Sequence, residues 1–156
     1  MKAVYFILFT LSSLGVFAQL KPLHEFDTDK QNILAMDISP DGKWLACGGD
    51  DNLVRFRDPE SGNELFTLTG QNDWVTALCF SSIENDQRPY FISGSRDGNV
   101  IIYEIDKRNI LFQNKAHDET INHIVILSSL NYMVAVSSDG FMSIVDLNTR
   151  QQVNKI

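Results

Sequence analysis

The 156-residue chain has few of the residues that build metal centres and disulfide frameworks. It contains two cysteines and three histidines, and neither a CxxC nor an HExxH motif occurs. Two cysteines exclude a disulfide-dense scaffold and a four-cysteine zinc site. His24 and His123 have no acid or histidine partner at ligand spacing. We therefore expect no metal site and no cofactor.

Long runs of one charge are also missing. The chain has 13 Lys and Arg against 20 Asp and Glu, a net charge of -7, and these residues are scattered. An acidic chain without basic runs is a poor partner for nucleic acid or for anionic lipid. Hydrophobic residues make up 44% and charged residues 21%, which is typical of one globular domain.

The first 18 residues have the layout of a secretory signal peptide. Lys2 is followed by an apolar stretch over residues 3–11, and Val16-Phe17-Ala18 offers small residues at the two positions that signal peptidase reads. An uncleaved membrane anchor is the alternative, but a spanning helix needs about 20 apolar residues. We expect cleavage before Gln19, no stable membrane insertion afterwards, and a secreted or periplasmic protein.

The rest of the chain repeats. Residues 33–58, 75–104 and 121–146 each hold an apolar run, a turn, a second apolar run, small residues leading to an aspartate, and a third β-rich run. The aspartates are Asp51, Asp97 and Asp139, which are 46 and 42 residues apart. One four-stranded propeller blade takes about 40–45 residues.

The local signals are those of strands and tight turns. Val, Ile, Phe, Tyr and Thr gather in the runs, Ser39-Pro40-Asp41-Gly42 is a turn by its chemistry, and no 3.6-residue periodicity follows residue 20. We expect innermost strands at 33–38, 75–80 and 121–127, second strands at 43–48, 89–94 and 131–137, third strands at 53–57, 99–104 and 141–146, and outermost strands at 64–68, 109–113 and 151–155. Residues 23–26 resemble a lone outermost strand.

These features resemble the WD-repeat β-propeller family. The stretch from Ile38 to Ala46 (ISPDGKWLA) matches the middle of the family's repeat, and Ser93-Gly94-Ser95-Arg96-Asp97 matches its aspartate turn. The resemblance covers roughly residues 23–156, and we expect a propeller portion at 19–156 with repeats at about 28–69, 70–115 and 116–156. It implies an all-β partial propeller, an open arc of about three four-stranded antiparallel blades, because a closed ring takes 4–8 blades.

The repeats depart from the family at its Gly-His and Trp-Asp pairs. In the family, the histidine, the turn aspartate, a serine or threonine and the tryptophan resemble one buried hydrogen-bond network. The third unit keeps His117 and Asp139 but has Ala135 at the hydroxyl position, and the second has Gln71 and Tyr103 as polar substitutes beside Ser93 and Asp97. We expect no unit to complete the network. Asp51, Asp97 and Asp139 should each accept main-chain N–H groups in their own hairpins, as structural rather than catalytic acids.

The resemblance places Trp74 and Arg96 on one rim of the propeller, and tryptophan and arginine are enriched in binding hot spots. The equivalent positions in the other units are Asn32 and Asp50, then Thr120 and Ser138. In the alternative reading, Trp74 packs between blades and Arg96 is merely solvated. The insert at 81–88 lies at the opposite rim and either contacts a partner or is a tolerated surface loop.

Trp44 and the two cysteines lie in predicted strands, where we expect them to contribute to packing. We expect Trp44 to pack between blades. Cys47 and Cys79 fall in adjacent units, where buried free thiols are favoured, and a disulfide is the alternative that an exported protein would permit.

These observations favour a non-catalytic scaffold that binds a protein or peptide. The alternative is the regulatory or substrate-binding portion of an extracytoplasmic propeller enzyme, but the innermost strands offer only Asp37 and His123, with no nucleophile paired to a base. The chain resembles the opening portion of a larger propeller, and its outer units show no polar cap. Self-association through open blade faces would then involve five residues, Ile121, Ile124, Ile126, Val134 and Val136.

Overall fold

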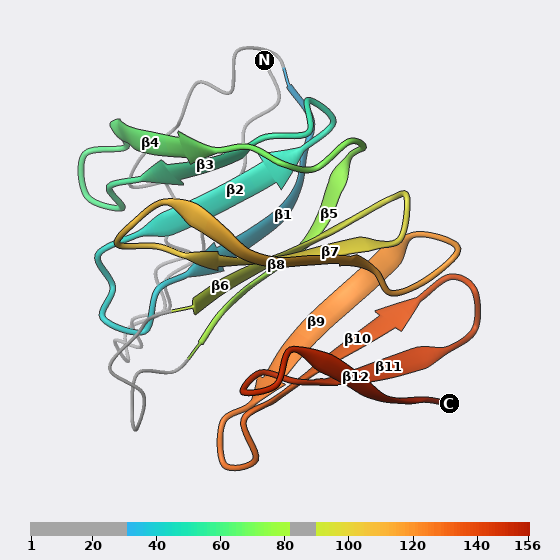
Figure 1. Ribbon diagram of the computed structural model, residues 1–156. Coiled ribbons are helices and arrows are strands. Elements are labelled where there is room, and N and C mark those ends of the chain that lie inside the picture. The colour runs from blue at the N-terminus through green and yellow to red at the C-terminus, as the bar shows by residue number, and fades with distance from the viewer. Residues whose placement is uncertain (1–30, 82–89) are drawn as a thin grey trace, which may run out of the picture.

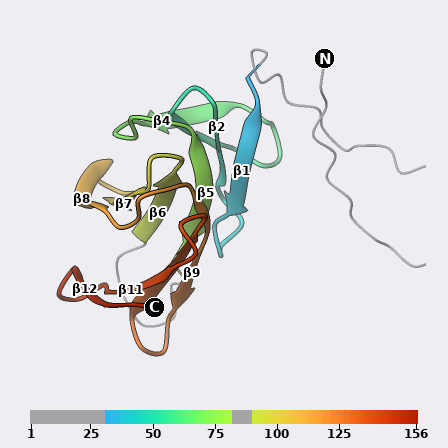
Figure 2. The same ribbon diagram turned by 90° about the vertical axis from the view of Figure 1, so that its right-hand side faces the viewer.

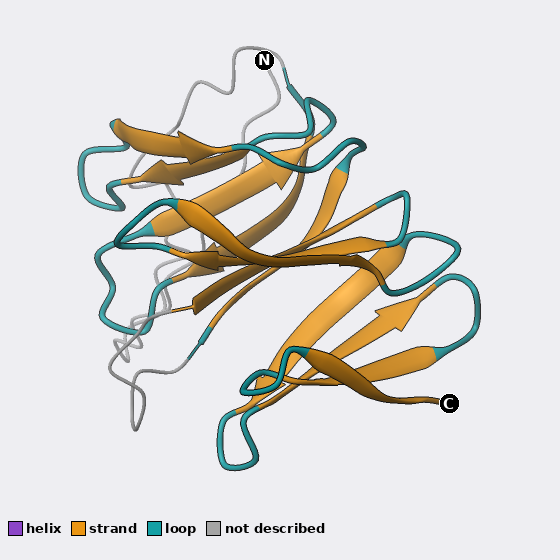
Figure 3. Ribbon diagram, in the orientation of Figure 1, coloured by secondary structure: helices purple, strands orange, loops and turns teal. Residues whose placement is uncertain are grey.

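The computed structural model describes residues 31–81 and 90–156, which form three four-stranded antiparallel sheets (Figures 1 and 3). The described part of the chain contains no helix, and thus none that could cross a membrane. The first sheet holds β1 (Ile33–Ile38), β2 (Leu45–Gly49), β3 (Val54–Arg57) and β4 (Glu64–Leu68). The second holds β5 (Val75–Phe80), β6 (Tyr90–Ser95), β7 (Asn99–Glu104) and β8 (Asn109–Lys115). The third holds β9 (Ile121–Leu127), β10 (Tyr132–Ser137), β11 (Met142–Asp146) and β12 (Gln151–Lys155).

The predicted all-β fold of three four-stranded blades is confirmed. Each sheet runs in chain order from its innermost to its outermost strand. The innermost strands match their predicted bounds, and most of the others differ from theirs by one or two residues. The predicted strand 23–26, the segment 1–18 and most of the insert at 81–88 lie outside the described residues.

The sheets stack face to face around two apolar cores. Phe56 and Val54 of the first sheet pack against Phe91 and Tyr103 of the second. The other face of the second sheet, with Ile92 and Ile102, packs against the third sheet through residues such as Met133. Figure 2 shows β1, β5 and β9 side by side along one edge of this stack, with β4, β8 and β12 at the opposite edge. The three sheets form an open arc, as the blade count predicts.

Two glycines let the innermost strands approach their neighbouring sheets. A Cβ on Gly48 would lie 2.5 Å from Cγ1 of Val75, and one on Gly94 would lie 2.6 Å from Cγ2 of Ile121. Neither position leaves room for a larger side chain without displacing the next sheet. The third sheet has Val136 at the equivalent position of its second strand.

The innermost strands are also joined by side-chain hydrogen bonds. Asp37 accepts the Phe80 N–H at 2.8 Å, and the Thr76 hydroxyl donates to the Ile121 carbonyl at 2.6 Å. These bonds satisfy main-chain groups that the sheets themselves leave unpaired. Asp37 therefore links the innermost strands of the first two sheets.

Two expectations about the outer faces are wrong. Ile121, Ile124 and Ile126 lie on the covered face of the third sheet, because the register of β9 with β10 turns them toward the second sheet. Val134 and Val136 do point outward, as expected. The sequence indicated no polar cap on the first sheet, but the outward face of this sheet does carry paired charged side chains. Arg55 pairs with Asp51 at 2.5 Å, and both Arg55 and Arg57 lie 3.5 Å from Glu64.

Trp44 lies one residue before β2 and packs edge-on against Phe56 and Phe66 of its own sheet. It borders the core between the first two sheets. Cys47 and Cys79 are free thiols, the first buried and the second half-buried. Burial raises the pKa of Cys47, and burial together with the Asp37 charge raises the pKa of Cys79 to about 11.

Candidate functional site

The six rim residues singled out in sequence form three equivalent pairs, one for each sheet. In each pair, the residue after the second strand donates its N–H to the carbonyl of the residue before the innermost strand. The distances are 3.2 Å from Asp50 to Asn32, 2.9 Å from Arg96 to Trp74, and 2.9 Å from Ser138 to Thr120. All six residues are at least partly exposed. We call this set the loop rim.

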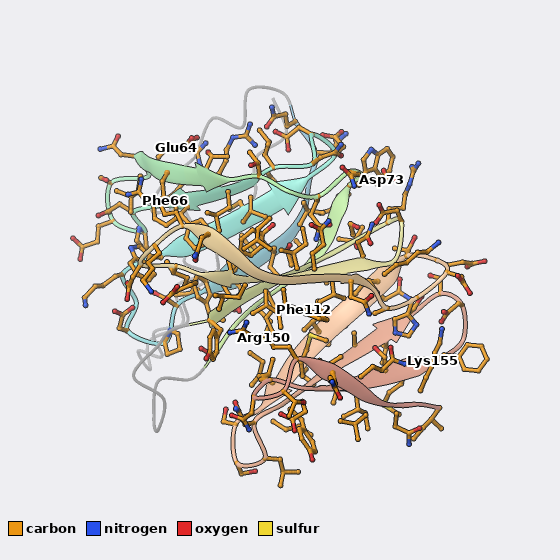
Figure 4. All side chains as sticks on the ribbon, viewed as in Figure 1. Glu64, Phe66, Asp73, Phe112, Arg150 and Lys155 are labelled. Atoms are coloured by element: carbon orange, nitrogen blue, oxygen red, sulfur yellow. The ribbon has the colours of Figure 1, made fainter. Side chains whose placement is uncertain are left out.

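The central pair of the loop rim is a stacked Trp–Arg unit. The Arg96 guanidinium lies 4.3 Å from the centre of the Trp74 ring, and its Nε donates to Asp73 at 3.2 Å. Asp73 also accepts the Trp74 N–H at 2.8 Å. Figure 4 labels Asp73 in the loop that leads into β5. Trp74 is 40% exposed, so the indole is held in place and still open to solvent. Trp74 is a member of neither apolar core between the sheets.

The flanking pairs are polar. Asn32 donates its side-chain amide to Asp50 at 2.6 Å. The Ser138 hydroxyl donates to Asn122 at 3.1 Å, and the Thr120 hydroxyl donates to the Arg96 carbonyl at 3.4 Å. The last bond joins the third pair to the central one. The rim therefore presents one aromatic–cation unit between two groups of hydrogen-bonding side chains.

Each turn aspartate accepts the N–H of the residue two positions further on. The partners are Leu53 for Asp51 at 3.2 Å, Asn99 for Asp97 at 3.1 Å and Phe141 for Asp139 at 3.0 Å. Asp97 also accepts from the hydroxyl of Ser95 and the amide of Asn99. These bonds stabilise the turns that contain the loop-rim residues Asp50, Arg96 and Ser138.

The third sheet contains a buried network of three of the four members, His117, Asp139 and a serine, with Val145 at the family's tryptophan position. His117 Nδ1 lies 3.0 and 3.1 Å from the Asp139 carboxylate oxygens, and Nε2 lies 2.9 Å from the Ser143 hydroxyl. A carboxylate only accepts, so Nδ1 carries a proton and donates it to Asp139, while Nε2 shares a hydrogen bond with the Ser143 hydroxyl. Ser143 is the cross-strand partner of Ala135. The hydroxyl comes from the neighbouring strand rather than from the family's position, where we expected it to be missing.

Asp139 is also tied to the last strand, because Lys155 of β12 lies 3.1 Å from its carboxylate (labelled in Figure 4). Burial raises the pKa of Asp139, but the hydrogen bonds that it accepts outweigh burial and hold the pKa well below the ordinary 3.8. The donors are the N–H groups of Phe141 and Asp118, the His117 ring and Lys155.

The second sheet builds its network from the polar substitutes. The Gln71 amide donates to the hydroxyl of Ser93 at 2.8 Å, and that hydroxyl lies 3.4 Å from the Tyr103 hydroxyl, which donates to the Thr69 carbonyl at 3.3 Å. Burial raises the pKa of Tyr103. Among the described residues, the Gln71 Oε1 atom has no hydrogen-bond partner. Asp97 instead bonds within its own turn.

The residues considered for chemistry do not converge. Asp37 accepts main-chain N–H groups, and His123 is exposed on the outward face of the third sheet. Within residues 31–81 and 90–156, no group of three or more His, Cys, Asp or Glu side chains is placed to hold a metal ion.

The chain matches a family profile and several known proteins. The family profile described as WD domain, G-beta repeat matches residues 20–58 and 62–104, more than half of the chain. The chain is 34% identical to pre-mRNA-processing factor 19 of Oryza sativa subsp. japonica over 81% of its length. It is 25% identical to nuclear distribution protein nudF of Aspergillus terreus over 80%, and 26% identical to a WD repeat-containing protein 55 homolog of Drosophila willistoni over 78%.

The chain spans 23% of the rice protein's length, 32% of the Aspergillus protein's and 23% of the Drosophila protein's. The match to the family profile, the relatives and the three stacked four-stranded sheets agree. The chain belongs to the WD-repeat family.

Proposed function

We propose that the chain is a non-catalytic scaffold that binds a protein or peptide at the loop rim. The observation that carries the proposal is the exposed Trp74–Arg96 stack, fixed from below by Asp73. Tryptophan and arginine are enriched among the few residues that carry most of the binding energy of an interface. A side chain that is already ordered loses less entropy when a partner binds. The WD-repeat relatives support the same general role.

The flanking pairs are suited to the polar periphery of an interface that is centred on this stack. Interfaces place aromatic and arginine anchors at the centre and polar groups around them. Asn32 with Asp50 lies on one side of the stack, and Thr120 with Ser138 lies on the other. The loop rim thus offers an anchor and hydrogen-bonding groups for the main chain or polar side chains of a partner.

The His117–Asp139–Ser143 network supports a scaffold rather than an enzyme. Its connectivity is that of a serine hydrolase triad, in which the serine oxygen must reach a substrate carbonyl. Here Ser143 is 0% exposed and His117 1% exposed. A hydroxyl sealed in this way has no access to a substrate, and the network instead fastens the Asp139 turn to β11.

The location of the protein follows from the proposed signal peptide at residues 1–18. We expect the chain to be exported and to begin at Gln19. N-terminal sequencing of protein recovered from outside the cytoplasm tests this expectation. Recovered protein that still carries Lys2 to Ala18 would show that the segment is not cleaved.

The binding role is tested with a displayed library of random peptides selected against the purified chain. Affinities of the selected peptides are then measured for Trp74→Ala, Arg96→Ala and Leu130→Ala. Leu130 is 59% exposed in the hairpin between β9 and β10, at the opposite rim, and serves as the matched control. We expect the first two variants to weaken binding about 30-fold, the equivalent of the roughly 2 kcal/mol typical of a hot spot. Undiminished binding by both would reject the loop rim as the site.

A further inference from the structure

The loops at the two rims of the stacked sheets differ in charge. On the side of the loop rim, the five described loops together hold seven Asp or Glu residues and a single Lys or Arg, which is Arg96. These loops are residues 50–53, 69–74, 96–98, 116–120 and 138–141. At the opposite rim, the five fully described loops hold four acidic and four basic residues. Those loops are residues 39–44, 58–63, 105–108, 128–131 and 147–150.

Four of the seven carboxylates on the loop-rim side already have partners inside the fold. They are Asp51, Asp73, Asp97 and Asp139. Of the other three, Asp118 lies 3.8 Å from Lys115, with both side chains exposed. Asp50 accepts only the neutral amide groups of Asn32, and neither Asp50 nor Glu119 has an ion-pair partner among the described residues. Two carboxylates are therefore left with their charge uncompensated.

These two carboxylates lie on either side of the central Trp–Arg stack. Glu119 directly precedes Thr120, whose hydroxyl donates to the Arg96 carbonyl at 3.4 Å. Asp50 and Trp74 are the equivalents of Arg96 and Thr120 one sheet earlier, where the sheets approach each other through the same kind of glycine contact. Asp50 thus neighbours the stack from the first sheet, and Glu119 neighbours it from the third.

A lysine or arginine side chain fits this arrangement. Both side chains can lay an apolar stem along an aromatic ring while the charged end reaches a carboxylate. The indole of Trp74 remains 40% exposed with Arg96 in place, and Arg96 itself shows that the ring stacks with a guanidinium at 4.3 Å. An acidic group would be drawn to Arg96 alone, whose charge Asp73 already compensates at 3.2 Å. The charge around the stack therefore favours a cation.

We propose that the partner of the loop rim is a basic peptide segment, with a lysine or arginine that packs on Trp74 and pairs with Asp50 or Glu119. This inference rests on the proposed function and adds the charge of the partner. The stack belongs to the second sheet, and both neighbours of that sheet are among the described residues. A surface with an excess of one charge also speeds the encounter with a partner of the opposite charge.

The first test compares three displayed libraries of random peptides, identical except for a fixed central Lys, Glu or Gln. Each is selected against the purified 156-residue chain. We expect binders mainly from the lysine library, with further Lys and Arg at the randomised positions. A synthetic copy of a selected peptide with acetyl-lysine at the fixed position should bind about ten-fold more weakly, because it loses the charge and keeps the stem.

The second test removes the carboxylates from the chain. Glu119→Gln should weaken the lysine peptides about three-fold, and the double variant Asp50→Asn/Glu119→Gln should weaken them about ten-fold. Glu60→Gln is the matched control, since Glu60 is an exposed carboxylate without an ion pair among the described residues, in a turn at the opposite rim. Raising the salt concentration from about 0.05 M to about 0.5 M should weaken wild-type binding and reduce its advantage over Glu119→Gln.

The outcomes separate this inference from the proposed function. Peptides that depend on Trp74 but come equally from the glutamate library would keep the loop rim as the site and overturn the basic partner. Lysine peptides that Glu60→Gln weakens as much as Glu119→Gln would overturn it as well, because no charge at the loop rim would then be recognised. No binders from any library, or binders that tolerate both Trp74→Ala and Arg96→Ala, would reject the proposed function and the basic partner together.

Discussion

The Ser143 hydroxyl lies 2.9 Å from Nε2 of His117, at a position where the family resemblance gives no hydroxyl. The serine stands directly across the sheet from Ala135, which occupies the family's hydroxyl position. Two cross-strand neighbours on one face of a sheet have Cβ atoms about 5 Å apart, so either can supply a hydroxyl to the same ring. In the third blade, the hydroxyl that bonds the histidine ring therefore comes from β11 instead of β10.

This relationship gives the first prediction. Ser143→Ala should lower the free energy of unfolding by about 1–2 kcal/mol, because the buried Nε2 loses its hydrogen-bond partner. The double variant Ala135→Ser/Ser143→Ala should recover part of that loss by returning the hydroxyl to the family's position. Urea denaturation measures both. A double variant no more stable than Ser143→Ala would show that only β11 can place a hydroxyl against His117.

The second prediction concerns Asp97. Asp97→Ala should destabilise the chain by about 1–3 kcal/mol, because the N–H of Asn99 and the hydroxyl of Ser95 both lose their acceptor. Asp97→Asn is the control, since its carbonyl oxygen still accepts the main-chain bond, and it should lose less. A thermal melt of Asp97→Ala that matches wild type within about a degree would mean that the aspartate is only a solvated turn residue.

Pattern and spacing predict most of the fold and fewer of the contacts. The three innermost strands follow from β-branched runs placed before turns, and the three rim pairs follow from the repeat alignment. Ser143 was missed because a motif is read along one strand, whereas the hydrogen bond depends on the register between two. Counting residues from Asp139 back to Ala135 and across the hairpin to Ser143 would have found it. The Arg55 and Arg57 cap was missed for the same reason, since it depends on β3 lying beside β4.

The third prediction is a pH dependence located at Asp139. Because its pKa is lowered in the folded chain, its carboxylate stabilises the fold at pH values above the ordinary 3.8, and this contribution is lost as the pH falls toward the folded-state value. Asp139→Asn has no such contribution. The difference in free energy of unfolding between the two proteins should thus be constant near neutral pH and shrink below about pH 4. A difference that stays the same down to about pH 2.5 would contradict the role of the carboxylate.

The fourth prediction concerns the thiols. Burial raises the pKa values of Cys47 and Cys79, so neither should react with a thiol reagent in the native chain at about pH 8. Unfolding in denaturant without reductant should expose both thiols of each chain. Fewer than two reactive thiols in the unfolded protein would indicate the disulfide that an exported protein permits.

The central claim is that a partner covers Trp74 on the loop rim, and the fluorescence of this one side chain tests it most directly. The chain has two tryptophans, so Trp44→Phe leaves Trp74 as the only one, with an indole that is 40% exposed. The variant is titrated with a peptide selected against the chain while tryptophan emission is recorded. The account predicts a blue shift that saturates with binding, because the partner removes water from the indole. Full binding with unchanged Trp74 emission would contradict it.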